Sequence, residues 1–227
     1  MHLLFSLKPS RKTVTRRLLA AALILVGCGG SRAKPTPASS FADDAPLNSF
    51  ASLPMVVMPA QGIRGGDSLG WSGKTGDRRA FLAAVDSALA TAVRDRGLTA
   101  WTLPSVLVQT ARKNPTYVAN PADVRAADAV RYLERKRDSQ IPEPVASQLR
   151  SYAAFHDARH ALIPVEVRFE PGRTPGTGRA VLRIAILDVR ASRLVFVGDI
   201  AGPEIPDFGP AVASDLARKF TDLVVPR

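Results

Sequence analysis

The clearest alternation of hydrophobic and polar positions lies in the last third of the chain and predicts β-structure. Along residues 163–170, one set of alternate positions is apolar and the other mostly charged: Ile163, Val165, Val167 and Phe169 against Pro164, Glu166, Arg168 and Glu170. A two-residue period places one set on the buried face of a strand and the other on its wet face. Apolar runs at 181–187 and 194–197 predict two more strands, with turns at 171–178 and 190–193. We therefore expect an antiparallel meander.

A period of three to four residues predicts amphipathic helices elsewhere. Residues 79–96 carry an apolar stripe that stops at Gly97, and residues 144–156 carry a second. A third helix opens at Pro210, with an apolar face that includes Val212, Leu216, Phe220 and Leu223. Two less regular helices are expected between the first and second of these. One is short and capped by Ser105, and the other is polar, runs from Pro121 to about Lys136, carries few apolar residues, and is the least secure of the expected elements.

These elements define a fold class. The run Met55–Pro59 predicts a buried strand early in the chain, and Trp101–Leu103 predicts a brief extended piece. We expect a single α/β domain with a mixed sheet, whose C-terminal antiparallel meander is packed by amphipathic helices. If the strand phase is right, Val167→Asp should unfold the domain, whereas Arg168→Asp should leave its melting nearly unchanged.

The amino-terminal segment has the pattern of a secretory signal. Basic residues between Arg11 and Arg17 precede nine uncharged residues, Leu18–Val26, too few for a membrane span of about 20 residues. The run closes with Leu25-Val26-Gly27-Cys28, which resembles the lipobox of bacterial lipoproteins. The resemblance implies cleavage between Gly27 and Cys28 and attachment of lipid to Cys28. Paired arginines also half match the twin-arginine pattern, so the export route stays open.

The resemblance also implies an organisation and a location. Residues 1–27 would be a lipoprotein signal peptide, residues 28–49 a lipidated flexible tether, and residues 50–227 a periplasmic α/β domain. The tether is rich in Gly, Ser, Ala and Pro and cannot bury enough surface to order itself. In such lipoproteins Asp after the cysteine favours the inner membrane. Here Gly29 follows, which implies the periplasmic face of the outer membrane, with the inner membrane as the alternative.

Charge and cysteine content change with this cleavage. The chain has a formal net charge of +11, and the signal holds five basic residues and no acid, so the mature chain carries about +6. No nucleic-acid partner is expected in the periplasm. Basic and acidic residues are interleaved, which is typical of a solvated surface. Cys28 is the only cysteine, so the domain has no disulfide and must be stabilised by its core.

Two stretches of the predicted meander resemble a family of periplasmic lipoprotein domains. They are Ala158–Val165 and Leu187–Phe196, the latter reading as a strand, a turn and a returning strand. Similar stretches occur in the curli-secretion lipoprotein, the penicillin-binding-protein activator lipoproteins and the amino-terminal domain of the Tol-system translocation protein. The resemblance covers residues 53–225 and implies a non-enzymatic domain that binds another envelope protein. Residues 101–142 are longer and more helical than that pattern, so neither pore formation nor propeller-based docking is implied.

Two segments carry incomplete versions of enzyme sites. Ser68–Thr75 lacks the first glycine of a phosphate-binding P-loop, for which Asp188 is the candidate magnesium-holding acid. The periplasm lacks ATP, so we expect no nucleotide and instead a loop that leads into a helix capped by Asp77. His156 and His160 would share a helix face and are weak candidates for metal ligands, but no third ligand accompanies them. We therefore expect no metal and no cofactor.

Two hypotheses about function remain. The first is a non-catalytic, lipid-anchored binding or assembly module of the bacterial cell envelope, which should expose an apolar patch or a free sheet edge. The alternative is an envelope hydrolase or metal-dependent enzyme, which should have a deep pocket with convergent titratable groups.

Overall fold

The structure is a computed structural model that describes residues 46–136 and 140–226, all within one compact unit. The expected signal peptide, the cleavage site at Gly27, the lipidation site at Cys28 and most of the tether lie outside the described residues. Within the described ranges, no helix has both the length and the hydropathy needed to cross a membrane.

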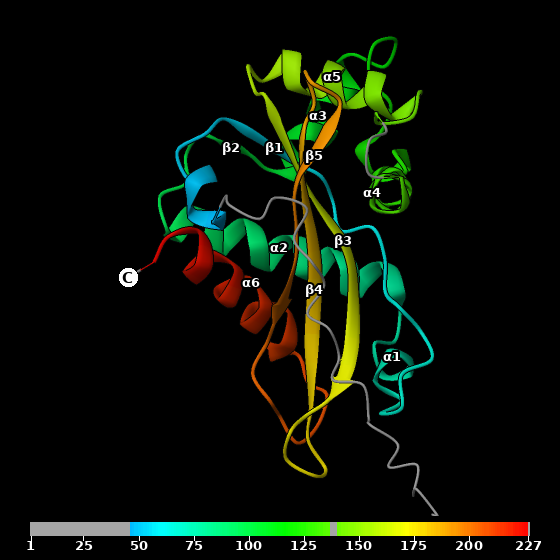
Figure 1. Cartoon of the computed structure of the whole chain (residues 1–227), viewed down its shortest axis with the longest axis vertical. Coiled ribbons are helices and arrows are strands. Elements are labelled where there is room, and N and C mark those ends of the chain that lie inside the picture. The colour runs from blue at the N-terminus through cyan, green and yellow to red at the C-terminus, as the bar shows by residue number, and fades with distance from the viewer. Residues whose placement is uncertain (1–45, 137–139, 227) are drawn as a thin grey trace, which may run out of the picture. The chain divides into compact units, whose positions relative to one another are not determined.

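A five-stranded mixed sheet forms the centre of the domain (Figure 1). Its order is β2-β1-β3-β4-β5, and β1 is parallel to both of its neighbours, whereas β3, β4 and β5 are antiparallel. The strands are β1 (Met55–Val57), β2 (Trp101–Thr102), β3 (His160–Pro171), β4 (Gly178–Asp188) and β5 (Arg193–Ala201). This confirms the predicted α/β class with a C-terminal antiparallel meander.

Helices cover both faces of the sheet and divide the core into two clusters. On one face lie α2 (Arg78–Asp95), α6 (Ala211–Val224) and the short helices η1 (Leu47–Phe50) and α1 (Trp71–Lys74). On the other face lie α3 (Pro104–Lys113), α4 (Ala126–Arg135) and α5 (Val145–Phe155), with η2 (Pro121–Asp123) between α3 and α4. Figure 1 shows α3, α4 and α5 gathered near one end of the long strands, so the other end of that face has no helical cover from them.

Local signals explain where α2 begins and ends. The Asp77 side chain caps the helix by accepting a hydrogen bond from the Arg79 N–H at 2.9 Å. At the other end Gly97 adopts φ +70°, and Leu98 N–H donates to Val93 O at 3.1 Å. Between these caps, α2 buries Val85, Leu89 and Val93, as its periodicity predicts.

A β-bulge in β3 corrects the predicted strand phase. Pro164 pairs with Ile184 and Glu166 pairs with Arg183, so Val165 is an extra residue without a partner. The bulge shifts the period by one position. The four apolar residues expected on one face are therefore divided: Ile163 and Val165 pack with α3, α4 and α5, whereas Val167 and Phe169 pack with α2 and α6.

The polar helix expected from Pro121 is two elements, and the second of them packs into the core. Asn120 caps only the short η2, the backbone extends at Val124, and α4 then begins at Ala126. Helix α4 buries three alanines together with Val130 and Leu133. Small alanines allow close packing, so a helix with few large apolar residues still lies firmly on the sheet.

Three other details differ at the ends of elements. Leu103, not Ser105, occupies the N-cap of α3, because Pro104 fills the first turn. On α6, Leu223 is 52% exposed and Val224 takes the buried position instead. Leu47, which the sequence places in the tether, is buried in η1.

Candidate functional site

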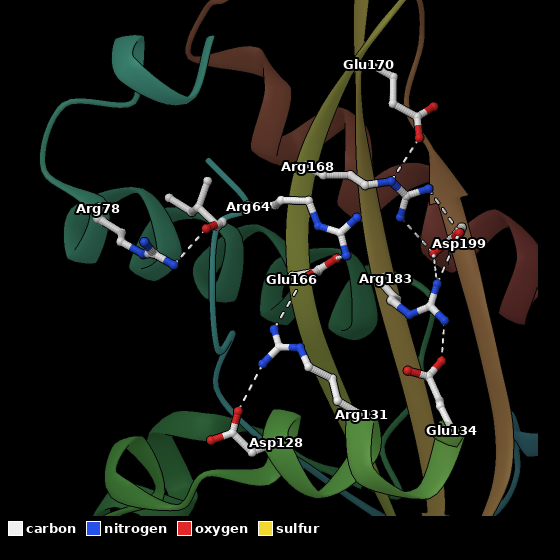
Figure 2. A network of polar contacts seen from close by, with 11 residues as sticks. Arg64, Arg78, Asp128, Arg131, Glu134, Glu166, Arg168, Glu170, Arg183 and Asp199 are labelled. Atoms are coloured by element: carbon white, nitrogen blue, oxygen red, sulfur yellow. Dashed lines mark hydrogen bonds and ion pairs between the residues drawn. The ribbon is translucent and has the colours of Figure 1, made fainter. Parts of the chain in front are cut away.

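The part of the sheet that α3, α4 and α5 leave uncovered carries a dense set of charged side chains, which we call the charged face (Figure 2). Its residues come from β3, β4, β5, α4 and the loop after β1. They are Arg64, Asp128, Arg131, Glu134, Glu166, Arg168, Glu170, Arg179, Arg183 and Asp199. Beyond the bulge, alternate β3 residues point to this face, which explains the spacing of Glu166, Arg168 and Glu170.

Asp199 is the centre of the larger chain of contacts. Arg168 donates to both of its carboxylate oxygens at 3.0 Å, and Arg183 Nη1 lies 3.2 Å from Oδ1 (Figure 2). Arg168 also donates to Glu170 at 2.8 Å, and Arg183 pairs with Glu134 of α4. These contacts tie three strands and a helix together.

A second chain of contacts is centred on Glu166, which is only 5% exposed. Arg64 Nη2 lies 2.6 Å from one of its oxygens, and Arg131 Nη2 lies 3.2 Å from the other. Arg131 also pairs with Asp128 at 3.1 Å within α4. Glu166 therefore joins the loop after β1 to α4 across the sheet.

The electrostatics of the charged face are self-compensating. Burial raises the pKa of the Asp199 carboxyl, but the hydrogen bond and charge of Arg168, with Arg183, outweigh it and hold the pKa below its usual value. The same balance lowers the pKa of Glu170, through Arg179 and Arg168. Neither carboxyl gains or loses a proton near neutral pH. Asp199 and Glu170 are therefore not poised for proton transfer. Their ion pairs with arginines stabilise the sheet and keep both side chains charged.

The strand β5 leaves one edge of the sheet open. Gly202 N–H donates to Ala180 O at 2.9 Å, so Gly202 and Ala180 form a hydrogen-bonded pair in the antiparallel ladder of β4 and β5. Because antiparallel pairs alternate, the N–H and C=O of Val197, Asp199 and Ala201 point away from β4. No described residue pairs with them. Asp199 is an exposed residue although its side chain is only 23% exposed, so its backbone supplies the accessible surface.

The open edge is short and bounded at both ends. Toward Arg193, the register shifts between Ile186 and Leu187, which leaves Val195 as the extra residue of a second bulge. Toward the other end, Pro203 lacks an N–H, and Ile205 again pairs with Gly178. Bulges and prolines prevent indiscriminate pairing of edge strands. Val197 is only 2% exposed, so the part left available is the window from Gly198 to Ala201, in which Asp199 and Ala201 are exposed.

A groove beside α2 contains the carboxyl group with the largest upward shift of its pKa. Asp86 lines it, and one oxygen of Asp86 accepts a hydrogen bond from Ala60 N–H at 2.8 Å. Burial raises the pKa of Asp86 from 3.8 to about 6, and this single hydrogen bond offsets only part of the effect. Asp123 lines the same groove.

Replacing Asp86 with Asn should stabilise the protein at neutral pH. The folded-state pKa lies above that of the unfolded chain, so the ionised carboxyl destabilises the fold above about pH 6, and this loss fades as pH falls toward 4. Asn keeps an oxygen for Ala60 N–H. We expect a gain of about 1–2 kcal/mol at pH 7.5 and almost none near pH 4, measured by urea unfolding at both values. A gain of the same size at both pH values would contradict the assignment.

The two candidate histidines are not brought together. Helix α5 ends at Phe155, and Asp157 has φ +46°, so His156 and His160 do not share a helix face. His156 Nε2 lies 3.0 Å from Thr110 Oγ1, whereas the His160 ring contacts Phe50. In residues 46–136 and 140–226, no three His, Cys, Asp or Glu side chains are grouped as metal ligands.

In the P-loop-like segment, the backbone N–H groups and the lysine that would bind phosphate already contact carboxylates of the protein. The Asp67 carboxylate accepts hydrogen bonds from the N–H groups of Leu69, Trp71 and Ser72, at 2.9–3.1 Å. Lys74 Nζ contacts Asp207 at 2.7 Å. Asp188, the candidate magnesium ligand, instead binds Arg159 and the turn amides of residues 190 and 191. The segment leads into a helix capped by Asp77, as predicted.

The fold and site define an α/β domain with an open sheet edge beside a charged face. No protein-family model matches the chain, and no curated protein matches its sequence. Four solved chains match in structure. One is a PelC dodecamer from Paraburkholderia phytofirmans, with 13% identity, coverage of 78% of this chain and 91% of that chain, and a TM-score of 0.36.

Proposed function

We propose that this protein is a non-catalytic binding module of the bacterial cell envelope, which takes an extended segment of another protein at the β5 edge. The observation that carries the proposal is the window from Gly198 to Ala201, where Asp199 and Ala201 are exposed and offer both N–H and C=O outward. An added strand would satisfy these groups in the way that edge-strand recognition uses elsewhere. This is one of the two surface features that the binding hypothesis requires.

The surroundings of the edge suit a specific partner. Leu194, Val195 and Phe196 are partly exposed at one end of β5 and offer apolar contact. Asp199 is held by Arg168 and Arg183, so its side chain is fixed before any partner arrives. A preorganised edge loses less conformational entropy on binding than a mobile one.

The proposal includes the location that the amino-terminal sequence favours. The domain would be held through lipid at Cys28 on the periplasmic face of the outer membrane, with the tether that begins at Cys28 as a spacer. Several acyl chains make such anchoring effectively permanent, since each buried methylene contributes about 0.8 kcal/mol. A Cys28→Ser protein that still fractionates with membranes would overturn the anchor.

Ala201→Pro should abolish partner binding without unfolding the domain. The Ala201 N–H points away from β4, so proline removes no hydrogen bond of the sheet but blocks an incoming strand. We expect envelope proteins recovered with the tagged wild-type protein to fall at least about tenfold, a loss of about 1.4 kcal/mol. The melting temperature should change by less than about 5 °C.

A matched change on α2 serves as the control. Ala84 is exposed there and distant in sequence from β5, and Ala84→Ser should leave recovery at the wild-type level. Full recovery with a folded Ala201→Pro protein would refute binding at this edge.

A further inference from the structure

The groove beside α2 takes no part in the strand edge or the charged face. Its volume is about 810 Å³, within the range of about 300–1,000 Å³ that is typical of ligand sites. It is formed by the segment after β1, the first half of α2, and η2 with the residue before it. Its polar lining consists of Gln61, Asp77, Arg78, Arg79, Asp86, Asn120 and Asp123.

Several of these polar groups already have partners. Arg78 donates to Ile63 O at 2.7 Å, and Gln61 donates to Pro59 O at 2.9 Å. Asp77 and Asn120 cap their own helices. Asp86 and Asp123 differ, because neither forms an ion pair with any arginine or lysine of the described residues. They line the groove from two separate elements.

Asp86 is the exception among the largely buried carboxylates. Glu166, Asp188 and Asp199 each contact an arginine. Among the residues that the structure describes, Asp86 has only the Ala60 N–H as a partner, and burial raises its pKa because this one hydrogen bond compensates the charge poorly. A carboxylate withdrawn from water is stabilised most effectively by a cation in contact with it.

We propose that this groove binds the cationic side chain of a basic peptide segment, with Asp86 as its counter-ion and Asp123 as the second carboxylate. The two arginines of the groove do not prevent this. Arg78 is held by Ile63 O, and Arg79 precedes Asp86 by two helical turns, about 10 Å along the axis. Repulsion over that distance is weaker than attraction at contact. The proposal is independent of the strand edge.

The Ala60 amide provides a direct readout, because it donates to Asp86. The probe is the blocked tripeptide acetyl-Gly-Lys-Gly-amide, added to the purified protein at pH 7.5 and low salt. We expect a saturable shift of the Ala60 amide resonance, with a dissociation constant on the order of millimolar. Acetyl-Gly-norleucine-Gly-amide, which lacks the charge, should cause no such shift. Binding should weaken below about pH 6 as Asp86 takes up a proton. The other charged groups that line the groove are Asp77, Arg78, Arg79 and Asp123.

Conservative variants separate the proposal from a loss of folding. Asp86→Asn should abolish the saturable response, and Asp123→Asn should weaken it several-fold, with melting temperatures at or above wild type. Asp95→Asn, an exposed change on α2 outside the groove, should leave it unchanged. Equal responses to the lysine and norleucine peptides, or unchanged binding by folded Asp86→Asn, would overturn the proposal.

Discussion

Replacing Val167 with Asp should prevent the domain from folding. Val167 has no exposed surface and lies in the core cluster between the sheet and helices α2 and α6. The substitution removes about 1.5–3 kcal/mol of apolar burial and adds a carboxylate with no partner, which costs several kcal/mol more. Typical domains are stable by only about 5–15 kcal/mol. Circular dichroism should show no cooperative melting transition at neutral pH.

The control for this change is Val106→Asp, which makes the same replacement on α3 at a residue that is 41% exposed. Its melting temperature should stay within about 5 °C of wild type. If the Val167→Asp protein folds and melts at the same temperature as the Val106→Asp protein, then Val167 does not point into the core after the bulge.

Replacing Arg168 with Asp should be the second most damaging change, which reverses the expectation drawn from the sequence. The side chain is not a solvated surface group, because it donates to Asp199 twice and to Glu170 once, with only 18% of its side chain exposed. Aspartate there would place three carboxylates together. Breaking a largely buried pair costs about 3–5 kcal/mol, and partial exposure reduces this to about 2–4 kcal/mol. Urea unfolding would measure the loss.

Two further proteins make that measurement specific. Arg94→Asp reverses the charge of an exposed arginine on α2 and should cost less than about 1 kcal/mol. Alanine at Arg168 and Asp199, singly and together, should give a coupling energy of about 1–3 kcal/mol. Equal losses for Arg168→Asp and Arg94→Asp would mean that the charged face contributes nothing to stability.

Features of the fold that depend on nearby residues were predictable from the sequence. The boundaries of α2 follow from Asp77 and Gly97, and the turn before β5 follows from residues 189–192, where the Asp188 carboxylate accepts two turn amides. The two bulges were not predictable. Each arises from pairing with β4, and the shift at Val165 moved Val167 to the other core cluster without any change in the sequence pattern.

The candidate site was harder to predict from the sequence than the fold, because it too depends on contacts between residues distant in the sequence. Asp86 has the spacing of a solvated residue on α2, and the Ala60 N–H that contacts it comes from a segment distant in the sequence. The open edge depends on strand order, because β5 pairs with β4 alone among the described strands and is the last strand on its side of the sheet. The charged residues at alternate β3 positions were visible, but their pairing with α4 and β5 was not.

Cross-linking in intact cells tests the central claim, strand addition at β5, most directly. A photoreactive amino acid is placed at Ala201 in one protein and at Ala84 in another, and both keep the wild-type amino-terminal segment. We predict a discrete cross-linked product with an envelope protein from position 201 and none from position 84, and that the partner peptide attached to residue 201 is an extended segment. Products of equal yield from both positions, or none from position 201 in a folded and exported protein, would contradict the account.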